Sequence, residues 1–290
     1  MRVSTVVSAA LAASLVAGCG GSSTPTGDHP RARQPQDVAR SEASRLIGLV
    51  RPPAGARPSD SSPVKWEDDP PQQSSTPDLV DLPRWWTVDS APDQVLGWLS
   101  THGVRGKHPA GRGTSSGPDQ PDVSYLIFRQ RPKQGLDDET VLVTVTSDGH
   151  GGSAIRADAQ VVWLPARDPA ETIRGQSAVD VTAYDGIPKR TLGHRVLTGA
   201  AARRLIAVIN QLPTAARGEH SCGADTGYRL VVRAGPLTFD DDVACFDVAV
   251  TDGRRSLPAL QSSGRFVHAV TSALGLPTFP RAPRPRRSPG

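Results

Sequence analysis

The residues with the clearest pattern for nucleophilic chemistry lie at Gly113–Gly117, where GTSSG matches G-x-S-x-G. In hydrolases this pattern holds a strained serine between a strand and a helix. Here prolines flank the motif at Pro109 and Pro118, so we expect no helix after the serine. His150-Gly151-Gly152 follows later, and its glycines are typical of a hairpin turn. We therefore predict no serine hydrolase and assign no catalytic residue.

Acidic runs and histidines are the next candidates, as metal ligands. Calcium loops alternate their ligands and place a glycine at the turn, whereas Asp240-Asp241-Asp242 and Asp137-Asp138-Glu139 are uninterrupted. We interpret both runs as solvated turns. No histidine forms an H-x-H or H-x-x-x-H pair, and no phosphate-binding or dinucleotide-binding glycine pattern is present. The sequence therefore predicts no metal site and no cofactor. The histidines are His29, His102, His108, His150, His194, His220 and His268.

Trp85 and Trp86 form the one aromatic pair, and such a pair could bind a carbohydrate or a wall polymer. Because side chains alternate along a strand, the two rings should point to opposite faces of a sheet. We expect both rings to serve packing. The alternative is wall binding through the ring that faces away from the core.

The N-terminus carries an export signal. Val6–Val16 is apolar and alanine-rich, too short to span a membrane but typical of a secretory signal. It ends at Val16-Ala17-Gly18-Cys19, which resembles the lipobox of bacterial lipoproteins. The resemblance implies cleavage before Cys19, a diacylglyceryl group on its sulfur, and an extracytoplasmic protein anchored to the outer face of the cell membrane. Two acyl chains give a stable anchor, where one would not. The alternative is an ordinary signal peptide in which the cysteine occurs by chance.

The other two cysteines are Cys222 and Cys245. An isolated pair in an oxidising exterior should form one disulfide. A disulfide that closes a loop of roughly 20 residues should stabilise the folded protein by about 3 kcal/mol. The alternative is a pair of buried free thiols. If the disulfide forms and Cys19 is lipidated, no cysteine is left as a nucleophile.

Composition limits the partners. The net charge of the 290 residues is +4, and Arg281–Gly290 contains four arginines and no acidic residue. The body is therefore near neutral, and we expect no nucleic-acid partner. Only one continuous apolar run exists, which excludes a multi-span membrane protein. The length predicts one or two domains, and the sequence does not determine the oligomeric state.

The chain divides into six predicted segments. We expect a signal peptide at 1–18, a lipid-anchored flexible tether at 19–36, a short helix with an irregular linker at 37–83, a first α+β half at 84–170, a second half with the disulfide at 171–276, and a basic proline-rich tail at 277–290. Composition predicts that both termini are disordered.

Each half shows the order strand, helix, strand, strand, strand. In the first half, 155–163 alternates inward apolar residues with Arg156, Asp158 and Gln160, which we expect to face outward. The segment 103–121 is rich in glycine and proline and predicts a loop. In the second half, helices are predicted at 199–212 and 263–274, and a turn at 240–242.

The predicted fold class is α+β, with two β-α-β-β-β-like halves, helices packed on antiparallel sheet, and disordered termini. The halves could form two small sheets or one longer sheet. Because the same order of elements occurs twice, we put forward an internal duplication as a hypothesis.

The body is similar to uncharacterised secreted lipoproteins of high-GC Gram-positive bacteria. The residues that carry this resemblance are Asp158–Pro165, Ile209–Pro213 and Ser221–Gly227. The resemblance supports a surface location and the disulfide, and it implies no activity. We therefore expect a non-enzymatic, lipid-anchored surface module that binds a protein or a cell-wall component. The alternative is a carrier of a small molecule or lipid at the outer face of the membrane.

Overall fold

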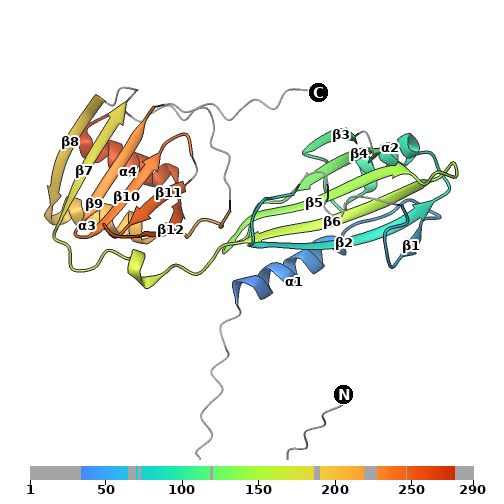
Figure 1. Cartoon of the computed structure of the whole chain (residues 1–290), viewed down its shortest axis with the longest axis horizontal. Helices are drawn as coiled ribbons and strands as arrows, with labels where there is room; N and C mark the ends of the chain where they lie inside the picture. Colours follow the sequence, from blue (N-terminus) through green and yellow to red (C-terminus); the bar gives the residue numbers. More distant parts are fainter. Residues whose placement is uncertain are drawn as a thin grey trace, which may run out of the picture. The chain divides into compact units, whose positions relative to one another are not determined.

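The computed structural model describes residues 34–64, 70, 73–117, 120–185, 190–218, 227–245 and 247–277 (Figure 1). The signal peptide, Cys19, most of the tether, Cys222 and the basic tail lie outside these residues, so the predictions made for them stay predictions. None of the helices in the described ranges is long and apolar enough to cross a membrane.

The fold is α+β, as predicted, and its strands form two separate antiparallel six-stranded sheets. The helices are α1 (Pro35–Ile47), α2 (Pro92–His102), α3 (Gly199–Asn210) and α4 (Gly264–Leu274), with a 3₁₀ turn η1 (Pro169–Glu171). The strands are β1 (Arg57–Ser59), β2 (Leu79–Val88), β3 (Gly111–Gly117), β4 (Gln120–Arg129), β5 (Leu136–Ser147), β6 (Ser153–Trp163), β7 (Ala178–Asp185), β8 (Arg190–Thr198), β9 (Arg229–Ala234), β10 (Leu237–Asp242), β11 (Asp247–Thr251) and β12 (Ser256–Gln261).

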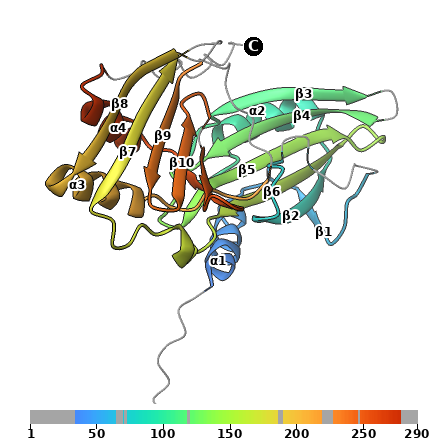
Figure 2. The ribbon, with the colours of Figure 1, turned by 60° about the vertical axis from the view of Figure 1, so that its left-hand side comes forward.

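The first sheet has the order β1-β2-β6-β5-β4-β3, and α1 and α2 pack on one of its faces (Figures 1 and 2). Apolar residues of α1 and α2 share one core with the predicted inward residues of β6, such as Ile155 and Val161. The predicted hairpin turn before β6 is confirmed: Ser147 pairs with Ser153, and Gly149 and Gly151 have positive φ angles.

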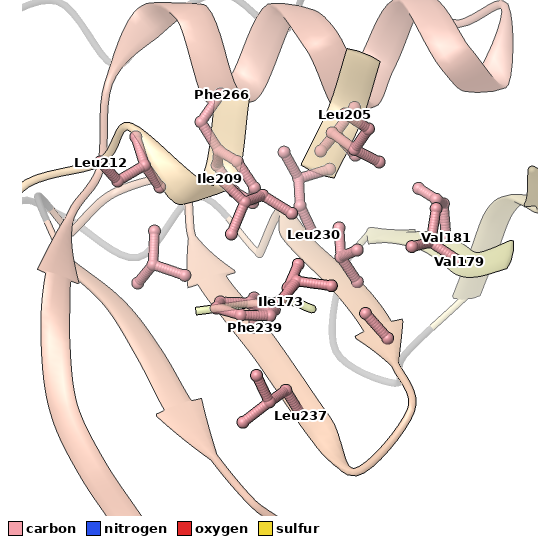
Figure 3. Packing of buried hydrophobic residues seen from close by; sticks show 14 of the residues in the cluster. Ile173, Val179, Val181, Leu205, Ile209, Leu212, Leu230, Leu237, Phe239 and Phe266 are labelled. Carbon is pink, nitrogen blue, oxygen red and sulfur yellow. The ribbon is translucent and has the colours of Figure 1, made fainter. Parts of the chain in front are cut away.

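The second sheet has the order β12-β11-β10-β9-β7-β8, and α3 and α4 cover one face of it. Figure 3 shows its core, in which Phe239 of β10 lies beneath Ile209 of α3 and Phe266 of α4. All three side chains have no exposed surface. Helix α4 ends where predicted, because Gly275 adopts the left-handed conformation that stops a helix, with φ of 69°.

The two sheets do not share one topology. Strand β2 pairs with β6, the last strand of its half, whereas β7 pairs with β8 and β9, which come next in the chain. In each half, two paired strands are followed by a helix and then by four more strands. In the first sheet the last of these four strands lies next to β2, whereas in the second sheet the first of them lies next to β7. The strand orders therefore do not support the duplication hypothesis.

Several predicted loops are strands. Strand β3 lies inside the segment 103–121 and pairs with β4, while β8 and β12 form where we predicted no strand. The predicted turn at 240–242 is wrong as well, because these residues continue β10 and pair with β9. Alternation along the strand then places Asp241 alone on the core-facing side, with no exposed surface.

A buried carboxylate connects the start of β2 with the segment after α3. Asp78 has no exposed surface and accepts hydrogen bonds from the Arg217 backbone nitrogen (2.7 Å) and Nε (2.9 Å). The Arg217 guanidinium also lies 5.6 Å from the centre of the Trp163 ring. Apolar contacts of Leu79 and Val162 with Ala216 extend this junction. Because Arg217 donates to Asp78 from both its backbone and its side chain, the junction is specific and not merely apolar.

Candidate functional site

The most unusual chemistry of the described residues lies on the face of the first sheet that α1 and α2 do not cover. Cross-strand pairing places Trp85 beside Arg156, Arg156 beside Thr144, and Thr144 beside Tyr125. Asp158 and Gln160 follow Arg156 at intervals of two residues, so they point to the same side. We call these six residues the polar face: Trp85, Tyr125, Thr144, Arg156, Asp158 and Gln160.

The central side chains of the polar face are buried. Arg156, Asp158 and Gln160 face away from the helices, as predicted. They are not solvated, however, since their exposed fractions are 6%, 0% and 5%. Polar side chains of this kind are rarely buried unless they are paired. Their burial therefore requires a physical explanation.

An ion pair explains part of it. Arg156 Nε donates to Asp158 Oδ1 at 2.8 Å, and its Nη2 lies 2.8 Å from the same oxygen. Burial raises the pKa of Asp158, and the charge and hydrogen bonds of Arg156 oppose that rise. Removing one partner of such a pair leaves an uncompensated buried charge, so the two residues depend on each other.

Other polar atoms on this face are unsatisfied. Within the described part of the chain, Asp158 Oδ2, Thr144 Oγ1, Gln160 Nε2 and Trp85 Nε1 are buried without a hydrogen-bond partner. Leaving such a group unpaired costs about 1–3 kcal/mol. Since these donors and acceptors lie on neighbouring strands, they form one polar row that could pair with a polar ligand.

Aromatic rings flank this row. Trp85 and Tyr125 are half-buried, and they lie on either side of Arg156 and Thr144 in the cross-strand row. The Tyr125 ring extends over Gly113, where an added Cβ would lie 2.4 Å from the Tyr125 hydroxyl. Any larger residue at that position would displace the ring. Gly113 of the serine motif is therefore used for packing.

The two tryptophan rings point to opposite faces of the sheet, as predicted. Trp86 is 8% exposed and belongs to the helix-facing core, whereas Trp85 lies on the opposite, polar face. Trp85 is thus the ring that faces away from the helix-facing core, and wall binding through it stays a proposal. Its indole is half-buried, so it forms part of a rim and not a flat exposed platform.

The serine motif has no hydrolase geometry. Gly113–Gly117 lies within β3, so the serines are on an edge strand and not at a strand-to-helix turn. His150 lies in the turn between β5 and β6. Across the described ranges, no three histidine, cysteine, aspartate or glutamate side chains are grouped as metal ligands. Cys245 follows β10, and its predicted partner Cys222 lies outside the described residues.

A pair of glutamates escaped the sequence reasoning. Glu139 was interpreted as part of a solvated turn, but it lies in β5 and is 1% exposed. Its carboxyl group hydrogen-bonds Glu42 of α1, which also contacts Lys133 and Arg45. Burial opposes ionisation of Glu42, but these hydrogen bonds outweigh it and lower its pKa to about 2. Burial raises the pKa of Glu139.

Two carboxyl groups with separated pKa values are the arrangement that acid–base catalysis uses. Here the protein's own groups hold both carboxyl groups, since Glu42 contacts Arg45 and Lys133 and hydrogen-bonds Glu139. The pair instead joins α1 to β5, and Glu139 Oε1 accepts a hydrogen bond from the Lys133 backbone nitrogen at 2.7 Å. We therefore assign it to the docking of α1. Its only sequence signal was the helical spacing of Glu42 with Ala39 and Ala43.

No protein family, curated protein or solved structure matches this chain. The resemblance to surface lipoproteins therefore stays a prediction.

Proposed function

We propose that this protein is a lipid-anchored, non-enzymatic binding module of the cell surface, and that its polar face binds a hydroxyl-rich component of the cell wall. The observation that carries the proposal is the polar row between Trp85 and Tyr125, in which buried donors and acceptors lack partners. Sites for such ligands combine aromatic walls with a few well-placed polar groups.

Sugar hydroxyls suit this row because each can donate and accept a hydrogen bond. A hydroxyl could donate to Asp158 Oδ2 and accept from Gln160 Nε2 or Trp85 Nε1. Asp158 and Thr144 have no exposed surface. We therefore expect a ligand to meet the half-buried rings first and to pair with the deeper groups as it moves inward.

Co-sedimentation with insoluble, protein-free cell walls of a Gram-positive bacterium tests the proposal. The full chain carrying Cys19→Ser can be used without detergent. Trp85→Ala should lower the affinity about tenfold, the effect of a central aromatic contact. Trp98→Ala is the matched control. Trp98 belongs to α2, which covers the face of the sheet opposite the polar face, and its ring stacks on His102 with ring centres 4.9 Å apart.

Two results would contradict the proposal: no sedimentation of the parent chain, or equal losses in the two tryptophan variants. Native mass spectrometry of the same sample addresses the carrier alternative. A mass excess that denaturation removes would favour a retained small molecule over a wall ligand.

The membrane anchor has its own test. In a Gram-positive host, the parent chain should fractionate with membranes, and Cys19→Ser should release the protein to the medium, since the anchor is then lost. Retention of the variant on membranes would refute the anchor without bearing on the polar face.

A further inference from the structure

Strand β8 forms one edge of the second sheet, and among the described strands it pairs only with β7. The opposite edge is closed, because Ala215 N donates to Ala259 O and Gln261 N donates to Pro213 O, both at 2.8 Å. Among the edge strands, β8 has nine residues, β3 has seven and β1 has three. Strand β8 is therefore the longest edge strand in the described ranges.

Edge strands usually carry charges that project over the edge and prevent pairing with other chains. The long polar side chains of β8 are instead held by the protein's own groups. Arg195 donates to the Ala273 carbonyl of α4 at 3.2 Å, and His194 Nε2 lies 2.7 Å from Asp180 Oδ2. These contacts direct the two side chains toward the faces of the sheet. They leave the backbone of the edge less shielded than the strand's composition suggests.

An apolar side chain is exposed on the same strand. Val196 is 57% exposed, and it is the one large hydrophobic residue in the described ranges with this degree of exposure. It pairs with Asp180 of β7, so it lies on the face that α3 and α4 do not cover. A strand added beside β8 would place a side chain next to Val196, at the distance of a cross-strand pair.

We propose that β8 binds an extended, acidic segment of a partner protein as an added strand. Backbone hydrogen bonds would supply the affinity, and the side chains would select the sequence. Residues 190–198 contain no acidic residue. Arg190 and His194 contact Asp185 and Asp180 of β7, but Arg195 donates to a neutral carbonyl and keeps an unmatched charge. Charge complementarity at Arg195 therefore favours acidic side chains that flank an apolar one. It disfavours a second copy of β8, which would bring like charges together.

Titration calorimetry with a short acetylated peptide of alternating glutamate and valine tests this proposal. The protein is the full chain carrying Cys19→Ser, and the comparison is the same peptide methylated on alternate backbone nitrogens. Methylation keeps every charge but removes the backbone donors, so we expect it to weaken binding about tenfold or more. Val196→Glu should weaken binding of the unmodified peptide to a similar extent. Ala249→Glu adds the same charge but should not weaken binding, because Ala249 is exposed on the interior strand β11.

Three outcomes would overturn the proposal. Equal binding of both peptides would mean that charge alone attracts them. Absence of binding would mean that the side chains of β8 prevent the addition of a strand. A dimer in sedimentation velocity without peptide, dissociated by Val196→Glu, would identify a second copy as the occupant. None of these results bears on the polar face, which lies on the other sheet.

Discussion

Asp241 makes the second sheet sensitive to pH. The carboxyl group has no exposed surface, and its row on the core face consists of Leu230, Val248 and Leu260. Burial raises its pKa from 3.8 to about 7, while the 2.9 Å hydrogen bond from Ser262 Oγ opposes the rise. The charges of Asp240, Asp242 and Asp247 raise it further.

The sign and the size of the effect follow from this pKa. Below about pH 4 the group is protonated in both the folded and the unfolded chain, and it contributes no pH dependence. As pH rises toward 7, the unfolded chain loses this proton and the folded chain keeps it, so stability falls. The shift corresponds to a loss of about 4 kcal/mol above pH 7, at about 1.4 kcal/mol for each pH unit.

Asp241→Asn removes the titration and keeps the shape of the side chain. The stability of the variant relative to the parent should therefore increase by about 4 kcal/mol between pH 4 and pH 8. Urea unfolding at both pH values measures this difference, and any packing defect of the asparagine cancels in it. All five tryptophans precede residue 164, so circular dichroism is the better signal for the second sheet.

The control is Asp93→Asn, which changes an exposed aspartate in the first turn of α2. Its relative stability should change far less between the two pH values. If the Asp241→Asn difference is also flat, Asp241 ionises as readily in the folded chain as in the unfolded one, and the reasoning from its burial is refuted.

Three further predictions concern two ion pairs and the disulfide predicted from the sequence. Glu42→Gln should destabilise the first sheet by about 1–3 kcal/mol at pH 7, because the contacts with Arg45 and Lys133 lose their charge. The difference from the parent should vanish as pH falls from about 4.5 toward 2, which urea unfolding followed by tryptophan fluorescence would show. Arg217→Ala should lower the midpoint of thermal unfolding, because the buried Asp78 carboxylate loses its partner, and Arg217→Lys should recover only part of that loss, since a lysine cannot reproduce the guanidinium fork on Asp78. Cys222→Ser should cost about 3 kcal/mol, and the exported parent should weigh two hydrogens less than its reduced form; an unchanged mass on reduction would exclude the bridge.

Apolar alternation was the reliable signal in the sequence. Ile155, Ala157, Ala159 and Val161 predicted both the strand and the face it packs on, because a one-residue error in register would have moved all of them from the helix-facing core to the polar face. The ends of α4 were equally clear, since Ser263 accepts a hydrogen bond from the Phe266 nitrogen and Gly275 supplies the left-handed stop.

Polar strands were the consistent failure. Strands β3 and β8 have few apolar residues because they are edge strands, and their pairing with β4 and β7 decides their structure. Asp241 was misread for a related reason, since a run of aspartates predicts a turn until the neighbouring strands fix its register. The polar face could not be predicted at all, because alternation indicates which residues share a face but not whether that face is buried.

The junction between Asp78 and Arg217 has a consequence for the order of folding. All strands of the first sheet lie between residues 57 and 163, so this sheet can pair fully before the second is synthesised. Asp78, however, is joined to a residue 139 positions later in the chain. A nascent chain that stops before Arg217 therefore carries a carboxylate whose burial has no compensating charge. We expect the N-terminal half, made alone, to leave this end of β2 open and to protect its backbone amides less from hydrogen exchange than the full chain does.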